Sequence, residues 1–593
     1  MASSAKRGSF ARTQDGESFG KGAILVRIEE TRTISRRHFL RLSAAGFTGA
    51  ALLGVAGCGG GETISGGGQG GGGGAGGNTF VFGRGADSVS LDPVNTTDGE
   101  SLRVTRQIFD GLLDFAPEST DLAPSLATEI PEPEDGGRSY TFKLREGVKF
   151  HDGAPFNAEA VKFNFDRWRD SKNPYHKGGG GQSENFAYYV GQFGGVDGDS
   201  VITNVEAVDE YTVRFSLKQP QGPFLKNIAM SPFGIGSPKA IKANVEDFWQ
   251  EPVGTGPFKF VEWNRGSTVE LEANKDWWGS DLPASEGGGG PQVDKVVIRA
   301  IPDNTSRVAA LTGGELSAAD GLTPDDVPSV KDSGLKVEFR PPLTIGYLAM
   351  NNQVKPFDDV NVRRAIYQAI DMDKIVEAFF GETGEVATTY MPPTVPFFNE
   401  SIERYPFDPD EAKRLLQEAG QENLETELWY MPIPRPYMPD GKGIAQAMQS
   451  DLEKIGVNAK LVTFEWGTYL EKTGSGQHPM ALLGWTGDNG DPDNFLNVLL
   501  GSASATETDA LNIAYYKDPE VDKLLKKGQT TIDEAERERV YMQAQELMVE
   551  DAPWVPIAYA KPPLGFQKNV QGYQASPTGG EAFNTVELSG GGA

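Results

Sequence analysis

Alternating hydrophobic and polar residues predict two strands in the first half of the chain. In YTFKLREGVKF (140–150), hydrophobic residues occupy every second position up to a turn at Glu146-Gly147, which leads into Val148 and Phe150; in TVRFSLK (212–218) they do so throughout. This period of two is typical of a strand that buries one face. The hydrophobic residues are Tyr140, Phe142 and Leu144 in the first stretch and Val213, Phe215 and Leu217 in the second.

Hydrophobic residues at helical spacing predict helices in the second half. VRRAIYQAIDMDKIVEAFF (362–380) carries them at positions 362, 365, 366, 369 and 370. In DPDEAKRLLQEAG (408–420), Asp408 is the expected N-cap, Pro409 the first helical residue and Gly420 the C-cap. The helix expected in GIAQAMQSDLEKIG (443–456) leads into a strand-like VNAKLVTF (457–464). The alternation of helices and strands predicts an α/β protein of the doubly wound type.

Length and charge narrow the classes of function. A chain of 593 residues exceeds what one hydrophobic core organises, so we expect at least two large lobes. Its net charge of -28 argues against a nucleic-acid partner, because phosphate binding requires basic patches. The single cysteine excludes an internal disulfide and any cysteine-based zinc or iron–sulfur site.

Residues 1–57 have the features of an export signal. SRRHFLR (35–41), with the arginine pair Arg36 and Arg37, resembles a twin-arginine motif, and the weakly apolar run that follows is too short and too rich in Gly and Ala to span a membrane. The run ends in VAGC, which resembles a lipobox with Cys58 as the lipidated residue; the alternative is an ordinary buried cysteine. Residues 59–77 hold thirteen glycines in nineteen positions. We therefore expect residues 58–77 to be a flexible tether with a reach of roughly 25 Å.

Several motifs resemble one family, the extracellular solute-binding proteins of peptide and nickel ABC importers (family 5). The motifs are LREGVKFHDGAPFNAEAVKFNFDR (144–167), GTGPFKF (254–260), WYMPIPRPYMP (429–439) and GWTGDNGDPDNF (484–495). RPY and GWTGDNGDPDN are similar to the dipeptide-binding members in particular. The resemblance implies a lipid-anchored binding component that captures dipeptides or short peptides and delivers them to an ABC permease driven by its ATPase subunits.

The resemblance also implies a fold. It is a two-lobe, periplasmic-binding-protein-like α/β fold of class II type, joined by a two-strand hinge. Lobe I is expected at 78–303, with an extra subdomain at about 95–235, and lobe II at 304–557. The chain returns to lobe I at 558–593. The expected crossing strands are VDKVVIRAIPD (293–303) and APWVPIAYA (552–560).

Two charged residues are the central site candidates. In the resembled proteins an arginine of RPY takes the ligand carboxylate and the first aspartate of GDNGDPDN takes its ammonium; these positions correspond to Arg435 and Asp488. A guanidinium forms a forked pair with a carboxylate, and an ionised carboxylate only accepts hydrogen bonds, as an ammonium requires. The alternatives are a solvated loop arginine and an Asx-turn aspartate. Asp491 and Asp493 are expected to shape the loop.

Aromatic and polar residues complete the expected site. Tyr437, Trp485 and Trp466 are candidate walls that enclose varied side chains, with core packing as the alternative. Thr97 and Asp98 correspond to a first-lobe stretch that lines the resembled site.

Enzymatic and metal chemistry lack support in the sequence. The aspartates of GWTGDNGDPDNF do not fit a calcium loop, and the three histidines after residue 77 bring no convergent set of metal ligands. The chain also lacks the Walker A, G-x-S-x-G and H-E-x-x-H motifs. We therefore expect a monomeric binding protein without cofactor or metal, exported to the periplasm or to the outer face of the cell membrane. The same role for another solute, a longer peptide, an oligosaccharide, haem or a nickel chelate, stays open.

Overall fold

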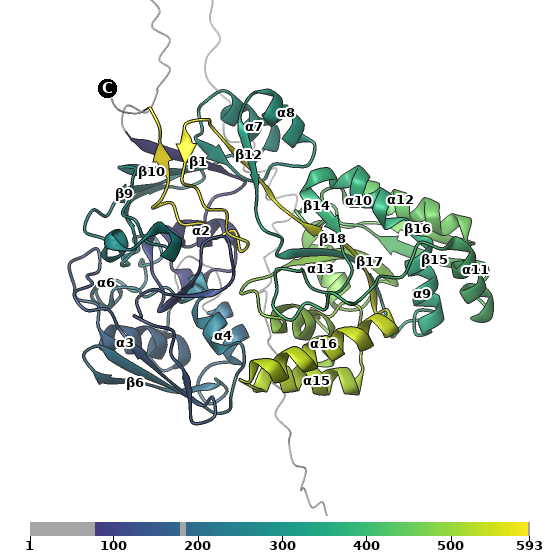
Figure 1. Ribbon diagram of the computed structural model, residues 1–593, viewed down its shortest axis with the longest axis horizontal. Coiled ribbons are helices and arrows are strands. Elements are labelled where there is room, and N and C mark those ends of the chain that lie inside the picture. The colour runs from purple at the N-terminus through teal and green to yellow at the C-terminus, as the bar shows by residue number, and fades with distance from the viewer. Residues whose placement is uncertain (1–77, 178–185, 591–593) are drawn as a thin grey trace, which may run out of the picture. The chain divides into compact units, whose positions relative to one another are not determined.

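The computed structural model describes residues 78–177 and 186–590. Its largest sheet has seven strands in the order β12-β19-β11-β1-β10-β9-β8, with β1 parallel to β10 and β11 and the other pairs antiparallel. The strands are β1 (Thr79–Arg84), β8 (Phe258–Asn264), β9 (Thr268–Ala273), β10 (Lys295–Ala300), β11 (Ala318–Ala319), β12 (Lys336–Phe339) and β19 (Pro563–Phe566). The helices that accompany this sheet along the chain are α2 (Gly99–Ile108), α6 (Pro238–Ala243), α7 (Asn304–Thr312) and α8 (Asp326–Asp332). This sheet is the centre of lobe I (Figure 1).

A separate four-stranded antiparallel sheet, in the order β4-β5-β7-β6, lies within the chain of lobe I. We call residues 94–235, with α2 excepted, the subdomain, because one cluster of buried side chains runs from Val94 to Ile235. Val104 and Ile108 of α2 belong instead to the core of the seven-stranded sheet. Its elements are β2 (Leu113–Phe115), β3 (Leu122–Pro124), β4 (Pro133–Glu134), β5 (Ser139–Lys143), α3 (Ala158–Arg169), α4 (Ala187–Phe193), β6 (Ile202–Asp209), β7 (Thr212–Leu217) and α5 (Phe224–Ile228). The subdomain therefore has a hydrophobic core of its own.

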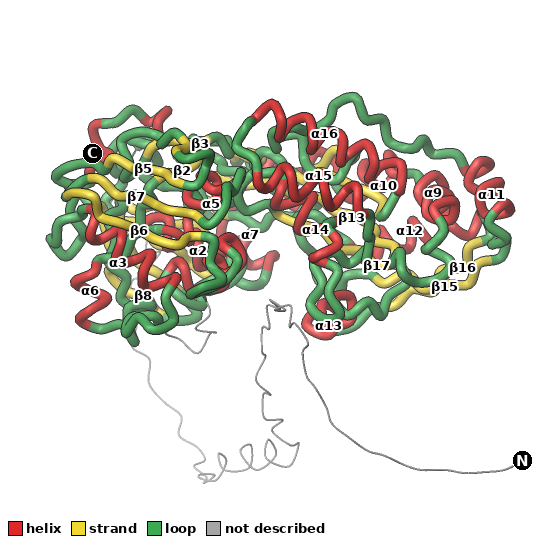
Figure 2. The backbone as a smooth tube through the Cα atoms, turned by 90° about the horizontal axis from the view of Figure 1, so that it is seen from below, coloured by secondary structure: helices red, strands yellow, loops and turns green. Residues whose placement is uncertain are grey.

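Lobe II is built on a six-stranded mixed sheet in the order β14-β18-β13-β17-β15-β16. Its strands are β13 (Thr344–Met350), β14 (Gly384–Val386), β15 (Leu424–Trp429), β16 (Val457–Val462), β17 (Met480–Thr486) and β18 (Trp554–Ala560). Its helices are α9 (Val360–Ala369), α10 (Met372–Phe379), α11 (Pro409–Glu418), α12 (Gly441–Lys454), α13 (Trp466–Gly474), α14 (Val498–Leu500), α15 (Pro519–Thr530) and α16 (Glu534–Asp551). Figure 2 shows α15 and α16 side by side, and they also lie next to each other in Figure 1.

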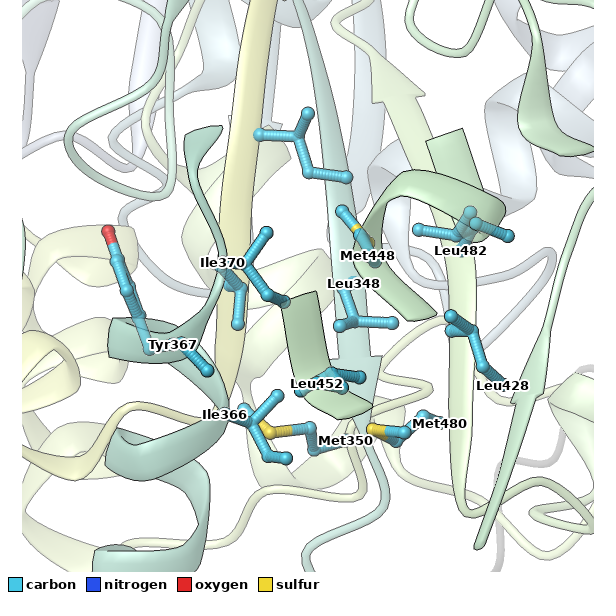
Figure 3. Packing of buried hydrophobic residues seen from close by; sticks show 14 of the residues in the cluster. Leu348, Met350, Ile366, Tyr367, Ile370, Leu428, Met448, Leu452, Met480 and Leu482 are labelled. Atoms are coloured by element: carbon cyan, nitrogen blue, oxygen red, sulfur yellow. The ribbon is translucent and has the colours of Figure 1, made fainter. Parts of the chain in front are cut away.

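The core of lobe II is packed between helices and the sheet. Figure 3 shows Leu348 and Met350 of β13 facing side chains of α9, and Met448 and Leu452 of α12 in the same cluster. Burial of such side chains stabilises the fold by about 1.5–3 kcal/mol each. β15 and β17 leave this core, and the candidate residues Arg435, Tyr437 and Asp488 follow the ends of these strands.

The strands and helices expected from hydrophobic periodicity are present. β5 and β7 bury alternate residues as predicted. Asp408 caps α11 by accepting a hydrogen bond from the Glu411 amide (3.0 Å), and Gly420 follows that helix at φ +67°. The stretch 362–380 forms two helices, α9 and α10, because the side chain of Asp371 caps a new helix at the Lys374 amide.

The lobe boundary differs from the one expected at 303/304. β10 lies inside the seven-stranded sheet and does not cross, while β11 and β12 beyond residue 304 pair in that same sheet. The chain passes to lobe II between β12 and β13 and returns between β18 and β19. These two connecting segments run side by side, and the Arg340 amide of one donates to the Pro562 carbonyl of the other (3.0 Å). The sequence could not place the boundary, because β11 is a two-residue strand without a recognisable pattern.

A network of buried ion pairs between side chains lies beside this crossing. Arg103 of α2 contacts Asp320 (2.7 Å), and Arg340 binds Glu581, which is wholly buried. Arg340 also lies 3.6 Å from Asp320, and Arg103 lies 3.0 Å from Glu100, so two cations and three anions form one network. The network joins α2, both ends of the β11–β12 segment and the C-terminal segment beside the crossing.

Some expectations fall outside the described residues. Arg36, Arg37, Cys58 and the glycine-rich tether all lie before residue 78. Among the helices that the structure describes, none is long and apolar enough to cross a membrane.

Candidate ligand-binding site

Asp488 lies in the loop that follows β17, and its carboxylate receives neutral hydrogen-bond donors. Oδ2 accepts from the Asn494 amide (3.0 Å) and Oδ1 from the Tyr188 hydroxyl (3.1 Å). The Asp488 amide in turn donates to Asn494 Oδ1 (2.9 Å). No ion pair to Asp488 occurs within residues 78–177 and 186–590. Burial raises the pKa of Asp488, and the two side-chain hydrogen bonds oppose that shift.

The other two aspartates of this loop, Asp491 and Asp493, have different hydrogen-bond and ion-pair partners. Asp491 accepts from the Asp493 amide (3.0 Å), which is the loop-shaping role expected for it, and both of its oxygens also lie 2.8 Å from Arg537 Nη2. Burial and the neighbouring Asp491 raise the pKa of Asp493 to about 7, and its Oδ1 is buried without a hydrogen-bond partner in the structure. Asp491 is thus neutralised by a cation of its own lobe, whereas Asp488 is not.

Arg435 lies in a tight turn whose backbone closes on itself. Its amide donates to the Met438 carbonyl (3.1 Å), and its carbonyl accepts from the Met438 amide (2.9 Å). The side chain is exposed, with the guanidinium carbon 5.4 Å from the centre of the Trp466 ring. Among the described residues, no carboxylate forms an ion pair with Arg435.

The three aromatic candidates come from neighbouring elements. Tyr437 belongs to the Arg435 turn, and its ring packs against Gly484 of β17, where a side chain would collide with it. Trp466 begins α13 and stacks on Tyr469, with ring centres 6.0 Å apart. The Trp485 indole donates to Asn494 Oδ1 (3.2 Å), the amide that also holds Asp488. Contacts through Gly484 and Asn494 thus join the turn, β17 and the aspartate loop.

The first-lobe candidates have different surroundings. Asp98 caps α2 by accepting from the Ser101 amide (2.8 Å), and it also accepts from the Thr96 hydroxyl (2.5 Å). Thr97 is exposed beside it. Burial, then Asp488, and to a smaller extent Asp98 raise the pKa of Tyr188. The hydrogen-bond partners of Asp98 are residues of its own segment.

Two residues of the site were not anticipated. Asn494 was inside a motif that carries the resemblance, yet nothing in the sequence indicated that its amide would hold Asp488 and Trp485. Tyr188 lies 300 residues from Asp488, and only the fold brings them together. In the described parts of the chain, no group of three or more His, Cys, Asp or Glu side chains is arranged to hold a metal ion.

Known proteins are similar to most of this chain. The family model "Bacterial extracellular solute-binding proteins, family 5 Middle" matches residues 121–507. A dipeptide-binding protein of Escherichia coli is 36% identical over 494 residues, which cover 81% of this chain and 89% of that protein. Heme-binding protein A of Haemophilus influenzae is 34% identical, with 86% and 93% covered.

A solved structure agrees with these relatives. The dipeptide-binding protein from Pseudoalteromonas sp. SM9913, in complex with Met-Leu, is 32% identical and superposes with a TM-score of 0.72 over 86% of this chain and 100% of that one. The match extends over both lobes and confirms the two-lobe α/β fold. The family model, the relatives and the superposition agree, and the chain belongs to the bacterial extracellular solute-binding proteins of family 5.

Proposed function

We propose that this chain is the ligand-capturing component of an ABC importer and that it holds a dipeptide or short peptide between its lobes. One observation carries the proposal. Asp488 has no cationic partner and Arg435 has no anionic partner among the described residues, although the neighbouring Asp491 is fully paired with Arg537. A zwitterionic ligand supplies both missing charges.

The chemistry of a dipeptide matches these two residues. Its ammonium and carboxylate lie two residue lengths apart, roughly 6–7 Å. Asp488 would accept hydrogen bonds from the ammonium, and the Arg435 guanidinium would form a forked pair with the carboxylate. A neutral oligosaccharide would need neither charge. The curated relative named for dipeptides and the structure solved with Met-Leu are in line with this class of ligand.

The remaining candidate residues would determine how wide a range of ligand side chains the site accepts. Trp466, Trp485 and Tyr437 would enclose ligand side chains with flat aromatic surfaces that tolerate varied chemistry. Thr97 and Asp98 would approach from lobe I. We expect no catalysis, because the proposed role needs only binding and release.

The finer cellular assignments belong to the same proposal. Arg36 and Arg37 would direct export, Cys58 would carry the lipid, and the glycine tether would let a monomeric body reach its permease. The permease and its ATPase subunits would be the protein partners. Metabolic labelling with a palmitate analogue tests the anchor, because a Cys58→Ala variant must lose the label.

The decisive test is calorimetric titration of protein that has been unfolded, dialysed and refolded to remove any carried ligand. The titrants are Ala-Ala, its N-acetylated and C-amidated forms, and Ala-Ala-Ala. We expect both capped forms to bind more than tenfold more weakly than Ala-Ala, a difference of about 1.4 kcal/mol or more. Equal binding of capped and free forms would refute the two-charge site. Binding of haem, a nickel chelate or a sugar in place of every peptide would refute the ligand class.

A further inference from the structure

Asn95 carries a buried amide without a hydrogen-bond partner. Its side chain is 5% exposed, and neither the nitrogen Nδ2 nor the oxygen Oδ1 has a partner. Among the residues that the structure describes, it is the one side chain with two buried polar atoms in this state. Asn164, another buried asparagine of lobe I, shows the usual arrangement: it donates to the Ala160 and Gly236 carbonyls (2.9 and 2.8 Å) and accepts from the Gly236 amide (3.1 Å). An unpaired buried amide costs stability, so its presence needs a physical reason.

The chain on both sides of Asn95 is firmly held. Three residues earlier, Asp92 forms a buried ion pair with Arg167, and the Asp92 carbonyl accepts from the Asn95 amide of the backbone (3.0 Å). Three residues later, Asp98 caps α2 by accepting from a backbone amide of that helix (2.8 Å). To turn the side chain of Asn95 out to water, the protein would have to break one of these anchors. The amide is therefore fixed in its buried position.

The position of Asn95 in the fold connects it to the candidate site. The short helical turn η1 (Pro93–Asn95) packs against α4. α4 carries Tyr188, whose hydroxyl donates to Asp488 Oδ1 (3.1 Å). The unpaired amide and the carboxylate proposed to hold the ligand ammonium are thus both next to this one helix.

A carboxamide side chain is complementary to a peptide group. Its nitrogen donates hydrogen bonds and its oxygen accepts them, whereas a peptide group offers one N–H donor and one C=O acceptor. In a dipeptide a single Cα separates the peptide group from the ammonium. A ligand whose ammonium is held by Asp488 therefore brings a peptide group with it, and the two orphaned atoms of Asn95 match the two polar atoms of that group.

We propose that Asn95 binds the peptide group of the ligand and thereby selects peptides over other zwitterions of the same length. The inference rests on the proposed function and deepens it. Asp488 and Arg435 would measure the distance between the two ligand charges, and Asn95 would recognise the chemical group between them. The stability that the unpaired amide costs the ligand-free protein would be recovered when the ligand supplies the missing hydrogen bonds.

Two ligands of equal length separate this role from the recognition of charge. Gly-Gly and δ-aminovalerate have the same number of atoms between the ammonium nitrogen and the carboxylate carbon, but only Gly-Gly contains a peptide group. Competition calorimetry on refolded protein, freed of any carried ligand, should show that the parent prefers Gly-Gly. In Asn95→Ala we expect this preference to fall about fivefold to a hundredfold, because neutral hydrogen bonds to the peptide group are lost. The affinity for δ-aminovalerate should stay unchanged.

Asn164→Ala is the matched control for binding and should keep the preference of the parent. An equal loss of affinity for both ligands in Asn95→Ala would overturn the proposal, because it would indicate a structural role, and so would an unchanged preference. If the parent binds neither ligand nor any other dipeptide, the proposed function is wrong and the role assigned to Asn95 falls with it.

The stability of the ligand-free protein gives an independent readout. Asn95→Ala and Asn164→Ala remove the same atoms from buried positions, but only the second breaks hydrogen bonds within the protein. In urea the unfolding midpoint of Asn164→Ala should be clearly below that of the parent, whereas Asn95→Ala should remain close to the parent. Addition of Gly-Gly should raise the midpoint of the parent more than that of Asn95→Ala. An Asn95→Ala chain that fails to fold, or that loses as much stability as Asn164→Ala, would overturn the proposal.

Discussion

Asp493 makes the stability of lobe II depend on pH. Its pKa is raised to about 7 by burial and by Asp491, against about 3.9 in an unfolded chain. Between these values the folded protein keeps a proton that the unfolded chain has lost, so the free energy of unfolding falls as pH rises from about 4 to about 7. A difference of about three pKa units corresponds to at most about 4 kcal/mol.

The substitution Asp493→Asn removes this dependence, because asparagine resembles the protonated carboxyl at every pH. We expect the variant and the parent to be equally stable near pH 4, and the variant to be more stable above pH 7 by about 2–4 kcal/mol. The positive groups near the site, Arg537 and Lys526, already oppose the shift, so they do not change its sign.

Urea unfolding at pH 4.5, 6 and 8 measures the effect. Tryptophan fluorescence reports on both lobes, and in lobe II Trp554 and Trp485 belong to or pack against the same cluster as Tyr541 of α16. Asp199→Asn, at an exposed position of lobe I, is the matched control and should leave the pH dependence unchanged. The reasoning is refuted if the stability difference between Asp493→Asn and the parent is the same at all three pH values.

Three further substitutions test the site and the crossing. Arg435→Ala and Asp488→Ala should each weaken dipeptide binding by about 2–5 kcal/mol in calorimetry, because one ligand charge is left unpaired; parent-like affinity in either would show that the assignment is wrong. Because burial raises the pKa of Asp488, acid protonates it more readily, and dipeptide affinity should fall as pH is lowered, with a pH-independent Kd as the contradicting result. Glu581→Gln leaves Arg340 with Asp320 as its one remaining carboxylate, at 3.6 Å, while Arg103 keeps Asp320 and Glu100. Unfolding in urea should therefore cost about 3–5 kcal/mol less; an unchanged midpoint would contradict this estimate.

Local structure could be predicted from the sequence where the signal is local. The cap at Asp408, the proline that follows it and the alternation in β5 and β7 each depend on residues within one turn or one strand. The sequence did not indicate that the helix ends before Asp371 and a second one begins after it. An aspartate in such a stretch can lie inside one helix or cap the next, and the packing of the helices determines which of the two occurs. The lobe boundary was missed for a different reason. β11 and β12 join lobe I by pairing with β1 and β19, strands from opposite ends of the chain.

The candidate site, too, was predictable from the sequence only in part. The motifs pointed to Arg435 and Asp488, but their pairing state depends on partners distant in sequence. Arg537, which neutralises Asp491, is 46 residues away, and Tyr188 is 300 residues from Asp488. No periodicity or spacing connects such residues. The sequence therefore indicated which charges to examine, and the fold was needed to see which of them lack a partner.

The contrast within the aspartate loop explains why a neutral amide holds Asp488. A buried carboxylate needs hydrogen-bond donors, and a cation would satisfy it most strongly, as Arg537 does for Asp491. A permanent cation at Asp488 would compete with a ligand ammonium for the same oxygens. Asn494 and Tyr188 orient the carboxylate and leave its charge uncompensated, with acceptor capacity to spare. Under the proposed function, the resulting cost in stability would be offset by the ammonium of a bound ligand, so the loop would give up part of its own stability to favour the occupied form.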